Sequence, residues 1–123
     1  MMAWAISAFA LKGRSVGADG LSRSLSSQSD KGFAVVDLFT SEGCSICPPA
    51  DAAIEKLQRQ AGDRPVYVLA YHVDYWNRLG WKDPFSSAAF SNRQDTYAKW
   101  LRLNSVYTPQ VIVNGRTEFV GSQ

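Results

Sequence analysis

The sequence predicts an α/β fold in which a helix joins two parallel strands and two further strands complete a mixed sheet. Two short apolar runs, residues 33–39 and 66–73, predict strands, and the first is typical of a strand covered on both faces. A segment with apolar residues at helical spacing lies between them. Near the end of the chain, Asn114-Gly115 separates two strand-like runs and predicts a hairpin. The expected order is β-α-β-α-β-β, with the last two strands antiparallel.

Local signals set the bounds of the first crossover. The strand FAVVDLF is rich in β-branched valine. The helix that follows begins at Pro48 and Pro49, where no amide hydrogen is needed, and carries apolar residues at Ala50, Ile54, Leu57 and Ala61. Gly62 follows the last of these residues, as a helix stop should.

A second helix is expected from about residue 87 to residue 103. Phe90, Tyr97 and Leu101 fall on one stripe of this segment. Ser86 or Ser87 could cap its start. The segment DYWNRLGWKDPF, which precedes this helix, is expected to be a loop.

Length and composition favour one soluble globular domain. The chain has 123 residues, of which 46% are hydrophobic and 20% are charged. Its net charge of +2 is too small to indicate a nucleic-acid partner or an anionic membrane surface. No apolar run approaches the roughly 18 residues that a membrane-spanning helix needs. These values exclude a nucleic-acid-binding protein and an integral membrane protein as first hypotheses.

Residues 1–32 differ in composition from the rest of the chain. An apolar stretch at 3–11 has the length of a signal-peptide core, although no basic residue precedes it. The serine- and arginine-rich part after it fits an organellar transit peptide about as well, and a misassigned start codon is a third alternative. We expect residues 1–32 to be a leader and disordered linker, and residues 33–123 to be the folded domain.

The two cysteines, Cys44 and Cys47, lie between the first strand and the first helix. A disulfide that closes so short a loop contributes only ~2 kcal/mol of chain-entropy stabilisation, so a structural staple is a weak explanation. At the amino end of a helix, the helix dipole and unpaired amides favour a thiolate. We therefore expect Cys44 to be an accessible nucleophile and Cys47 a more buried resolving thiol, acting through a mixed disulfide.

His72 supports a different hypothesis, a metal site. It lies near the carboxyl end of the second parallel strand, the sheet edge that also carries the cysteines. Cys44, Cys47 and His72 could together bind copper or zinc. A histidine bonded to the backbone within the core is the alternative interpretation of His72.

Three separated blocks, VVDLFTSEGCSICPPAD, AYHVDYWNRLGWKDPF and VYTPQVIVNGRTEFVGS, resemble a secreted bacterial family within the thioredoxin-like superfamily, the domain of unknown function 1223. The resemblance covers about residues 33–121. It implies a thioredoxin-like β-α-β-α-β-β fold with a central mixed sheet, export to the periplasm or the medium, and a redox role. It also implies that Thr108 and Pro109 form a cis peptide bond beside the cysteines.

Further site residues follow from the same resemblance. Asp37 resembles, with a one-residue offset, the buried acid that serves as a proton acceptor for the second cysteine. Its alternative role is a contact with a basic partner away from the site. Thr108 and Pro109 are expected to align an extended substrate. Independently of the resemblance, Tyr75 and Trp76 belong to a cluster of aromatic residues after the second strand that could form a wall beside Cys44. Packing beneath the loop is the alternative for the two aromatic residues.

The predicted function is that of a thiol–disulfide oxidoreductase with no cofactor other than its own disulfide. Its expected partners are a protein or small molecule that carries a thiol or disulfide, and a redox protein that recharges the cysteine pair. A copper- or zinc-binding module and a noncatalytic interaction domain are the alternatives. Since the final helix of a thioredoxin-like fold is not found in the sequence, we also expect exposed apolar sheet surface and a marginally stable or homodimeric product.

Overall fold

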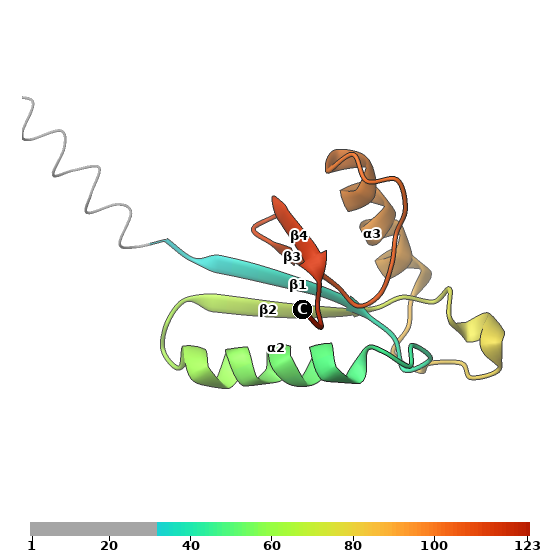
Figure 1. Cartoon of the computed structure of the whole chain (residues 1–123), viewed down its shortest axis with the longest axis horizontal. Coiled ribbons are helices and arrows are strands. Elements are labelled where there is room, and N and C mark those ends of the chain that lie inside the picture. Colours follow the sequence, from blue (N-terminus) through green and yellow to red (C-terminus); the bar gives the residue numbers. More distant parts are fainter. Residues whose placement is uncertain (1–31) are drawn as a thin grey trace, which may run out of the picture. The chain divides into compact units, whose positions relative to one another are not determined.

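A computed structural model describes residues 32–123 (Figure 1). The predicted leader and linker, apart from Gly32, lies outside the described residues. The described part contains a sheet of four strands, two α-helices and one short 3-10 helix. This mixed α/β arrangement confirms the predicted element order and is consistent with a thioredoxin-like fold.

The sheet has the strand order β2-β1-β3-β4. Strand β1 (Ala34–Thr40) pairs in parallel with β2 (Val66–His72), and on its other side pairs antiparallel with β3 (Gln110–Val113). Strand β4 (Thr117–Val120) pairs antiparallel with β3 through the predicted hairpin. Asn114 and Gly115 both have positive φ angles in this hairpin, as its turn chemistry requires. The central strand β1 ends at Thr40, four residues before Cys44.

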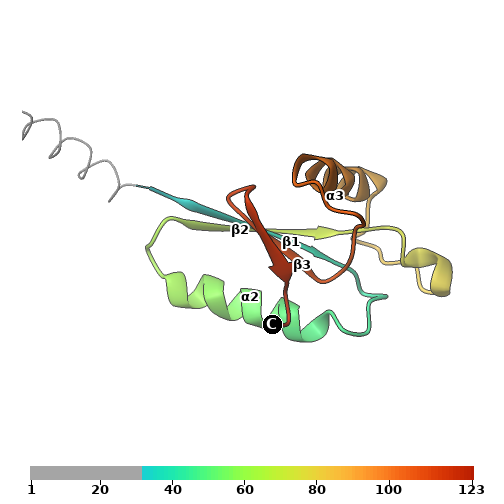
Figure 2. The same cartoon turned by 45° about the horizontal axis from the view of Figure 1, so that its top comes forward.

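The two α-helices lie on opposite faces of the sheet, as Figures 1 and 2 show. Helix α2 (Pro48–Ala61) joins β1 to β2, and helix α3 (Ala88–Trp100) follows the loop after β2. Ser87 caps α3 by accepting a hydrogen bond from the amide of Ala89. Helix α3 ends before the predicted residue 103, because Arg102 adopts a left-handed conformation with φ of 58°.

Alternation along β1 separates two hydrophobic clusters. Val36 and Leu38 pack with Ala50 of α2 and with Val111. Phe39 packs with Val73 and Ile112 on the opposite face, where Tyr97 of α3 joins the cluster. Successive side chains of a strand point to opposite faces, so the parity of a β1 residue decides which helix it contacts.

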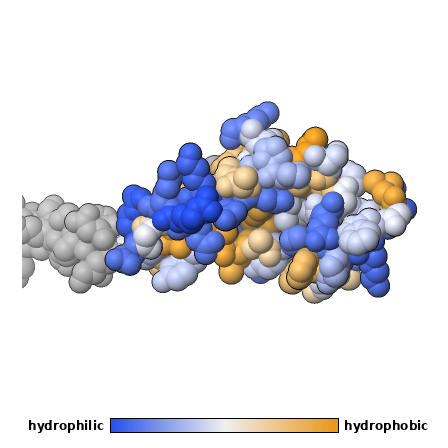
Figure 3. Space-filling view, turned by 90° about the horizontal axis from the view of Figure 1, so that it is seen from below, coloured by the Kyte–Doolittle hydropathy of each residue, from blue (hydrophilic) through white to orange (hydrophobic). Residues whose placement is uncertain are grey.

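Strand β2 is less covered than its apolar sequence predicts. Tyr67 is 57% exposed and Leu69 is 42% exposed, so one face of this strand is open to solvent along part of its length. β2 is an edge strand, and Phe90 of α3 covers it only near Tyr71. Figure 3 shows hydrophobic patches among hydrophilic side chains on the molecular face seen from below. Within residues 32–123 no helix follows β4, and none is long and apolar enough to cross a membrane.

Gly121 lies where the end of β4 meets the start of α2. A Cβ atom at this position would lie 2.9 Å from the Cβ of Ala50 and 3.1 Å from Cγ2 of Val111. We predict that Gly121→Ala lowers the free energy of unfolding by about 1–3 kcal/mol, as overpacking does in a core. Urea denaturation measures this loss, with the exposed Ser122→Ala as a control. Equal stability of the two variants would contradict the tight contact.

Candidate functional site

The two cysteines form a disulfide at the junction of β1 and α2. Their sulfurs are 2.14 Å apart and their Cα atoms are 5.4 Å apart. The amide of Cys44 donates to the carbonyl of Ser41, and the amide of Cys47 donates to the carbonyl of Cys44. Cys47 is the N-cap residue of α2. The pair therefore occupies a tight turn held by backbone hydrogen bonds at the start of the helix.

Both cysteines are buried. Cys44 is 2% exposed and Cys47 is not exposed at all, whereas Ile46 between them is 61% exposed. The expectation of an accessible Cys44 is therefore wrong for the disulfide form. A reagent that attacks this disulfide needs a movement of the residues around Cys44.

The first turn of α2 is poor in amide donors and rich in polar contacts. Pro48 and Pro49 occupy its first two positions and carry no N–H. The amide of Asp51 donates to the carbonyl of Cys47, and its carboxylate accepts a 2.7 Å hydrogen bond from Thr40 Oγ1. Asp51 thus ties the helix start to the last residue of β1.

The predicted cis peptide bond between Thr108 and Pro109 is present, and both residues are buried. The indole Nε1 of Trp76 donates a 2.8 Å hydrogen bond to Thr108 Oγ1. At its other end, the Cβ of Trp76 lies 3.1 Å from the point where a Cβ on Gly43 would stand. Trp76 therefore connects the residue before Cys44 with the residue before Pro109.

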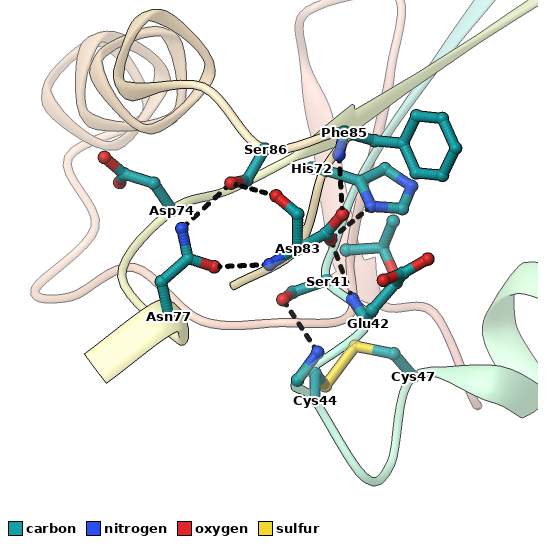
Figure 4. Close-up of polar contacts among 12 residues, drawn as sticks. Ser41, Glu42, Cys44, Cys47, His72, Asp74, Asn77, Asp83, Phe85 and Ser86 are labelled. Atoms are coloured by element: carbon teal, nitrogen blue, oxygen red, sulfur yellow. Dashed lines mark hydrogen bonds and ion pairs between the residues drawn. A yellow bond between two sulfur atoms is a disulfide. The ribbon is translucent and has the colours of Figure 1, made fainter. Parts of the chain in front are cut away.

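Asp83, in the loop between β2 and α3, is a site residue that the sequence analysis missed. Its carboxylate is fully buried. It accepts hydrogen bonds from the amides of Glu42 and Phe85, both at 2.9 Å, and lies 2.6 Å from His72 Nδ1 (Figure 4). Because an ionised carboxylate only accepts, Nδ1 of His72 carries the shared hydrogen. Asp83 thereby holds together the cysteine turn, the end of β2 and its own loop.

These contacts keep Asp83 ionised. Burial raises the pKa of the carboxyl, but the hydrogen bonds from Glu42, His72 and Phe85 outweigh burial and hold the pKa below its usual value. A second contact reinforces the attachment, because Trp81 Nε1 donates a 2.9 Å hydrogen bond to the carboxylate of Glu42. The loop after β2 is thus bound to Glu42, in the turn before Cys44, through both the amide and the carboxylate of that residue.

Asp37, the predicted proton acceptor, lies on the sheet face that carries α3. Its carboxylate accepts a 2.6 Å hydrogen bond from the Tyr97 hydroxyl and lies 3.8 Å from Arg93 Nη2. The side chains of β1 that face α2, the helix that starts at the cysteines, are those of Val36 and Leu38. The structure therefore places Asp37 in the alternative role, with a basic partner and away from Cys47.

His72 is engaged by Asp83 rather than by the cysteines. Within residues 32–123, no group of three or more His, Cys, Asp or Glu side chains is arranged to hold a metal ion. The structure thus does not bring Cys44, Cys47 and His72 together as a ligand set. The interpretation of His72 as a residue bonded to the backbone is also wrong in detail, because its partner is a buried carboxylate.

Tyr75 and Trp76 line a pocket of about 540 Å³ together with Asp74, Arg78 and Val106. The Tyr75 hydroxyl donates a 2.9 Å hydrogen bond to Gln94. Burial raises the pKa of Tyr75 to about 12, against the opposing effect of that hydrogen bond and with a further increase from Asp95. Of the predicted substrate-binding residues, Trp76, Thr108 and Pro109 are therefore brought together, and Tyr75 stands beside them on the pocket wall.

Comparisons with known proteins agree with this architecture. The model of a family described as "Protein of unknown function (DUF1223)" matches residues 35–123. The chain belongs to this family. No curated protein matches the chain.

A solved structure also supports the fold. The chain is similar to a protein from Agrobacterium tumefaciens whose crystal structure is known, with 49% sequence identity and a TM-score of 0.67. The similarity covers 72% of this chain and 39% of the other protein, so the chain spans well under half of that relative's length. The predicted resemblance to the family is thereby confirmed.

Substitution of Asp83 tests whether its buried carboxylate stabilises the fold. We predict that Asp83→Asn lowers the free energy of unfolding at neutral pH by at least about 1.5 kcal/mol, because hydrogen bonds to a buried charge are lost. Since folding lowers the pKa of Asp83, its contribution is present above the unfolded pKa of about 3.9 and disappears as the pH falls through the folded value. Denaturation of wild type and variant across acidic pH measures the difference. A constant difference down to the most acidic pH would contradict it, and exposed Asp63→Asn is the control.

The new placement of Asp37 leads to a spectroscopic prediction. Burial, followed by the hydrogen bond and charge of Asp37, raises the pKa of Tyr97. In Asp37→Asn, Tyr97 should ionise at lower pH than in the wild type, because the carboxylate charge is gone. Near-ultraviolet titration of each protein, with a Tyr97→Phe protein as the reference, isolates this residue. An unchanged titration would show that Asp37 does not act on Tyr97.

Proposed function

We propose that the chain is a thiol–disulfide oxidoreductase that works through Cys44 and Cys47. The observation that supports this most strongly is the position of the pair, in a turn at the start of α2 and joined through Trp76 to the cis Thr108–Pro109 segment. So short a loop gains only ~2 kcal/mol from a disulfide, so stability alone is a poor reason for the bond. A bond that exchanges electrons explains its placement better.

The reduced protein would act on a substrate disulfide in two steps. The Cys44 thiolate attacks one substrate sulfur, the substrate S–S bond breaks, and the other substrate sulfur leaves as a thiolate that takes up a proton. Cys47 then loses its proton and attacks the sulfur of Cys44. The second substrate thiol is released and the Cys44–Cys47 bond forms again. Two electrons pass from the protein to the substrate, and a dithiol partner returns them.

The two cysteines have unequal roles in this proposal. Cys44 is the attacking residue, because it precedes the helix, while Cys47 is the fully buried N-cap residue of α2. Asp83 is a positioning residue that holds the turn before Cys44 through the amide of Glu42. Asp37 has no part in the proton transfer, because its carboxylate is engaged with Tyr97.

Single cysteine variants test the assignment. We predict that reduced Cys47→Ser accumulates a covalent mixed disulfide with a disulfide-bonded peptide, because the resolving thiol is absent. Cys44→Ser should accumulate far less, because in this assignment Cys47, the N-cap residue of α2, only resolves the mixed disulfide. Mass spectrometry after acid quenching measures the adduct. Equal trapping by both variants would reverse the roles.

Equilibration of the wild type with glutathione tests the function itself. The pair should pass reversibly from disulfide to dithiol as the ratio of reduced to oxidised glutathione rises, and thiol alkylation followed by mass spectrometry counts the two forms. The Cys44→Ser, Cys47→Ser double variant is the control for non-specific labelling. A pair that stays oxidised at every ratio, together with no trapped adduct, would exclude the oxidoreductase function.

A further inference from the structure

Trp76 lies between the two segments that a substrate would have to reach. Its Cβ lies 3.1 Å from the point that a Cβ on Gly43, directly before Cys44, would occupy. Its indole Nε1 donates a hydrogen bond to Thr108, directly before Pro109. Pro109 in turn lies near α2, since a Cβ on Gly121 would stand 3.4 Å from the Cβ of Pro109 and 2.9 Å from that of Ala50. The indole therefore bridges the space between the cysteine turn and the proline segment.

The burial of Cys44 has a chemical consequence. Exchange requires the incoming sulfur to reach the sulfur that it attacks, so access limits the rate as directly as reactivity does. Cys44 is 2% exposed although its neighbours Ser45 and Ile46 are exposed. Cys44 is thus buried within a turn whose next two residues face solvent.

The backbone around Trp76 is fastened, and its side chain packs against the cluster of Phe39, Val73 and Ile112. Asp83 and Trp81 tie the loop to Glu42, and Asn77 Oδ1 accepts from the amide of Asp83. The indole Nε1 of Trp76 donates its hydrogen bond to Thr108 Oγ1. The pocket of about 540 Å³ beside Trp76 offers space next to the ring. Rotation of the side chain toward this space would take the indole away from Thr108.

We propose that Trp76 determines substrate specificity: its indole closes the approach to Cys44, and an extended peptide displaces it while a small thiol does so poorly. The inference rests on the proposed redox function of the same pair. A displaced indole leaves Thr108 Oγ1 without its donor and uncovers apolar surface. An extended peptide can replace both, with its backbone amides and side chains. A small thiol can replace neither the hydrogen bond to Thr108 nor the lost apolar contacts, so the full free-energy cost of displacing the indole slows its reaction.

The primary test measures the rate at which dithiothreitol reduces the Cys44–Cys47 disulfide. A thiolate of dithiothreitol attacks the sulfur of Cys44, Cys47 leaves, and the second thiol of the reagent closes its own ring and releases Cys44. Quenching with an alkylating reagent and counting labelled thiols by mass spectrometry gives the rate without a biological substrate. Trp76→Phe should be reduced about two- to tenfold faster than wild type, the range that corresponds to one lost hydrogen bond. Trp100→Phe, at a tryptophan that is 76% exposed, is the matched control.

Removal of the acceptor provides a second route to the same result. Thr108→Val is close in shape, keeps the indole and removes the same hydrogen bond, so it should accelerate reduction to a similar extent. The Trp76→Phe, Thr108→Val protein should be no faster than the faster single variant, because the shared bond is lost only once. Accelerations that multiply, or reduction rates equal to that of Trp100→Phe, would overturn the proposal. If one variant fails to fold, the other still decides the outcome.

Substrate class is tested by comparing glutathione with a reduced extended peptide that carries one cysteine. Trp76→Ala should increase the rate of disulfide reduction by glutathione more than the rate by the peptide. Equal increases for both reagents would overturn the assignment to a peptide. The proposed redox function is judged separately, because trapping by Cys47→Ser can fail while the dithiothreitol rates still report access to the disulfide.

Discussion

The carboxylate of Asp83 is the contact on which the arrangement of this site depends. A buried charge is costly unless hydrogen bonds compensate it, and Asp83 obtains this compensation from two backbone amides and one imidazole. These donors come from the turn before Cys44, from its own loop and from the end of β2. Because one anion needs all of them, the loop after β2 cannot leave the cysteine turn without exposing or stranding that charge. The fixed position of Trp76 above Gly43 follows from this attachment.

The fold explains why these segments meet. β1 and β2 run in parallel, so their carboxyl ends reach the same edge of the sheet, where catalytic and binding residues of open α/β sheets gather. Thr40 and His72 are register partners at that edge. Strand β3 pairs antiparallel with the other side of β1, so β3 begins near the carboxyl end of β1. The residues just before β3, Thr108 and Pro109, therefore lie at the same edge of the sheet. A mixed sheet thus supplies three segments to one site from distant parts of the chain.

The sequence was sufficient for features set by local chemistry. Pro48 and Pro49 mark the start of α2, Asn114-Gly115 marks the hairpin, and the run at β1 gives the central strand. The family blocks led to the cis bond at Pro109. Asp83 was missed because its donors are up to 41 residues away, and no local pattern distinguishes a buried aspartate from one in a solvated loop. The role of Asp37 depended on strand parity, in which a shift of one residue exchanges the two faces of the sheet.

The two prolines at the start of α2 affect the relative stability of the dithiol and disulfide states of the cysteine pair. Of the first three helix residues, only Ala50 carries an N–H, although this is the part of a helix where unpaired amides usually surround an anion. A negative sulfur at this helix start would therefore receive less hydrogen-bond support than at a helix without prolines. Weaker support for the anionic sulfur makes the dithiol state less favourable relative to the disulfide. In the proposed exchange, the prolines would thus favour donation of electrons over their acceptance.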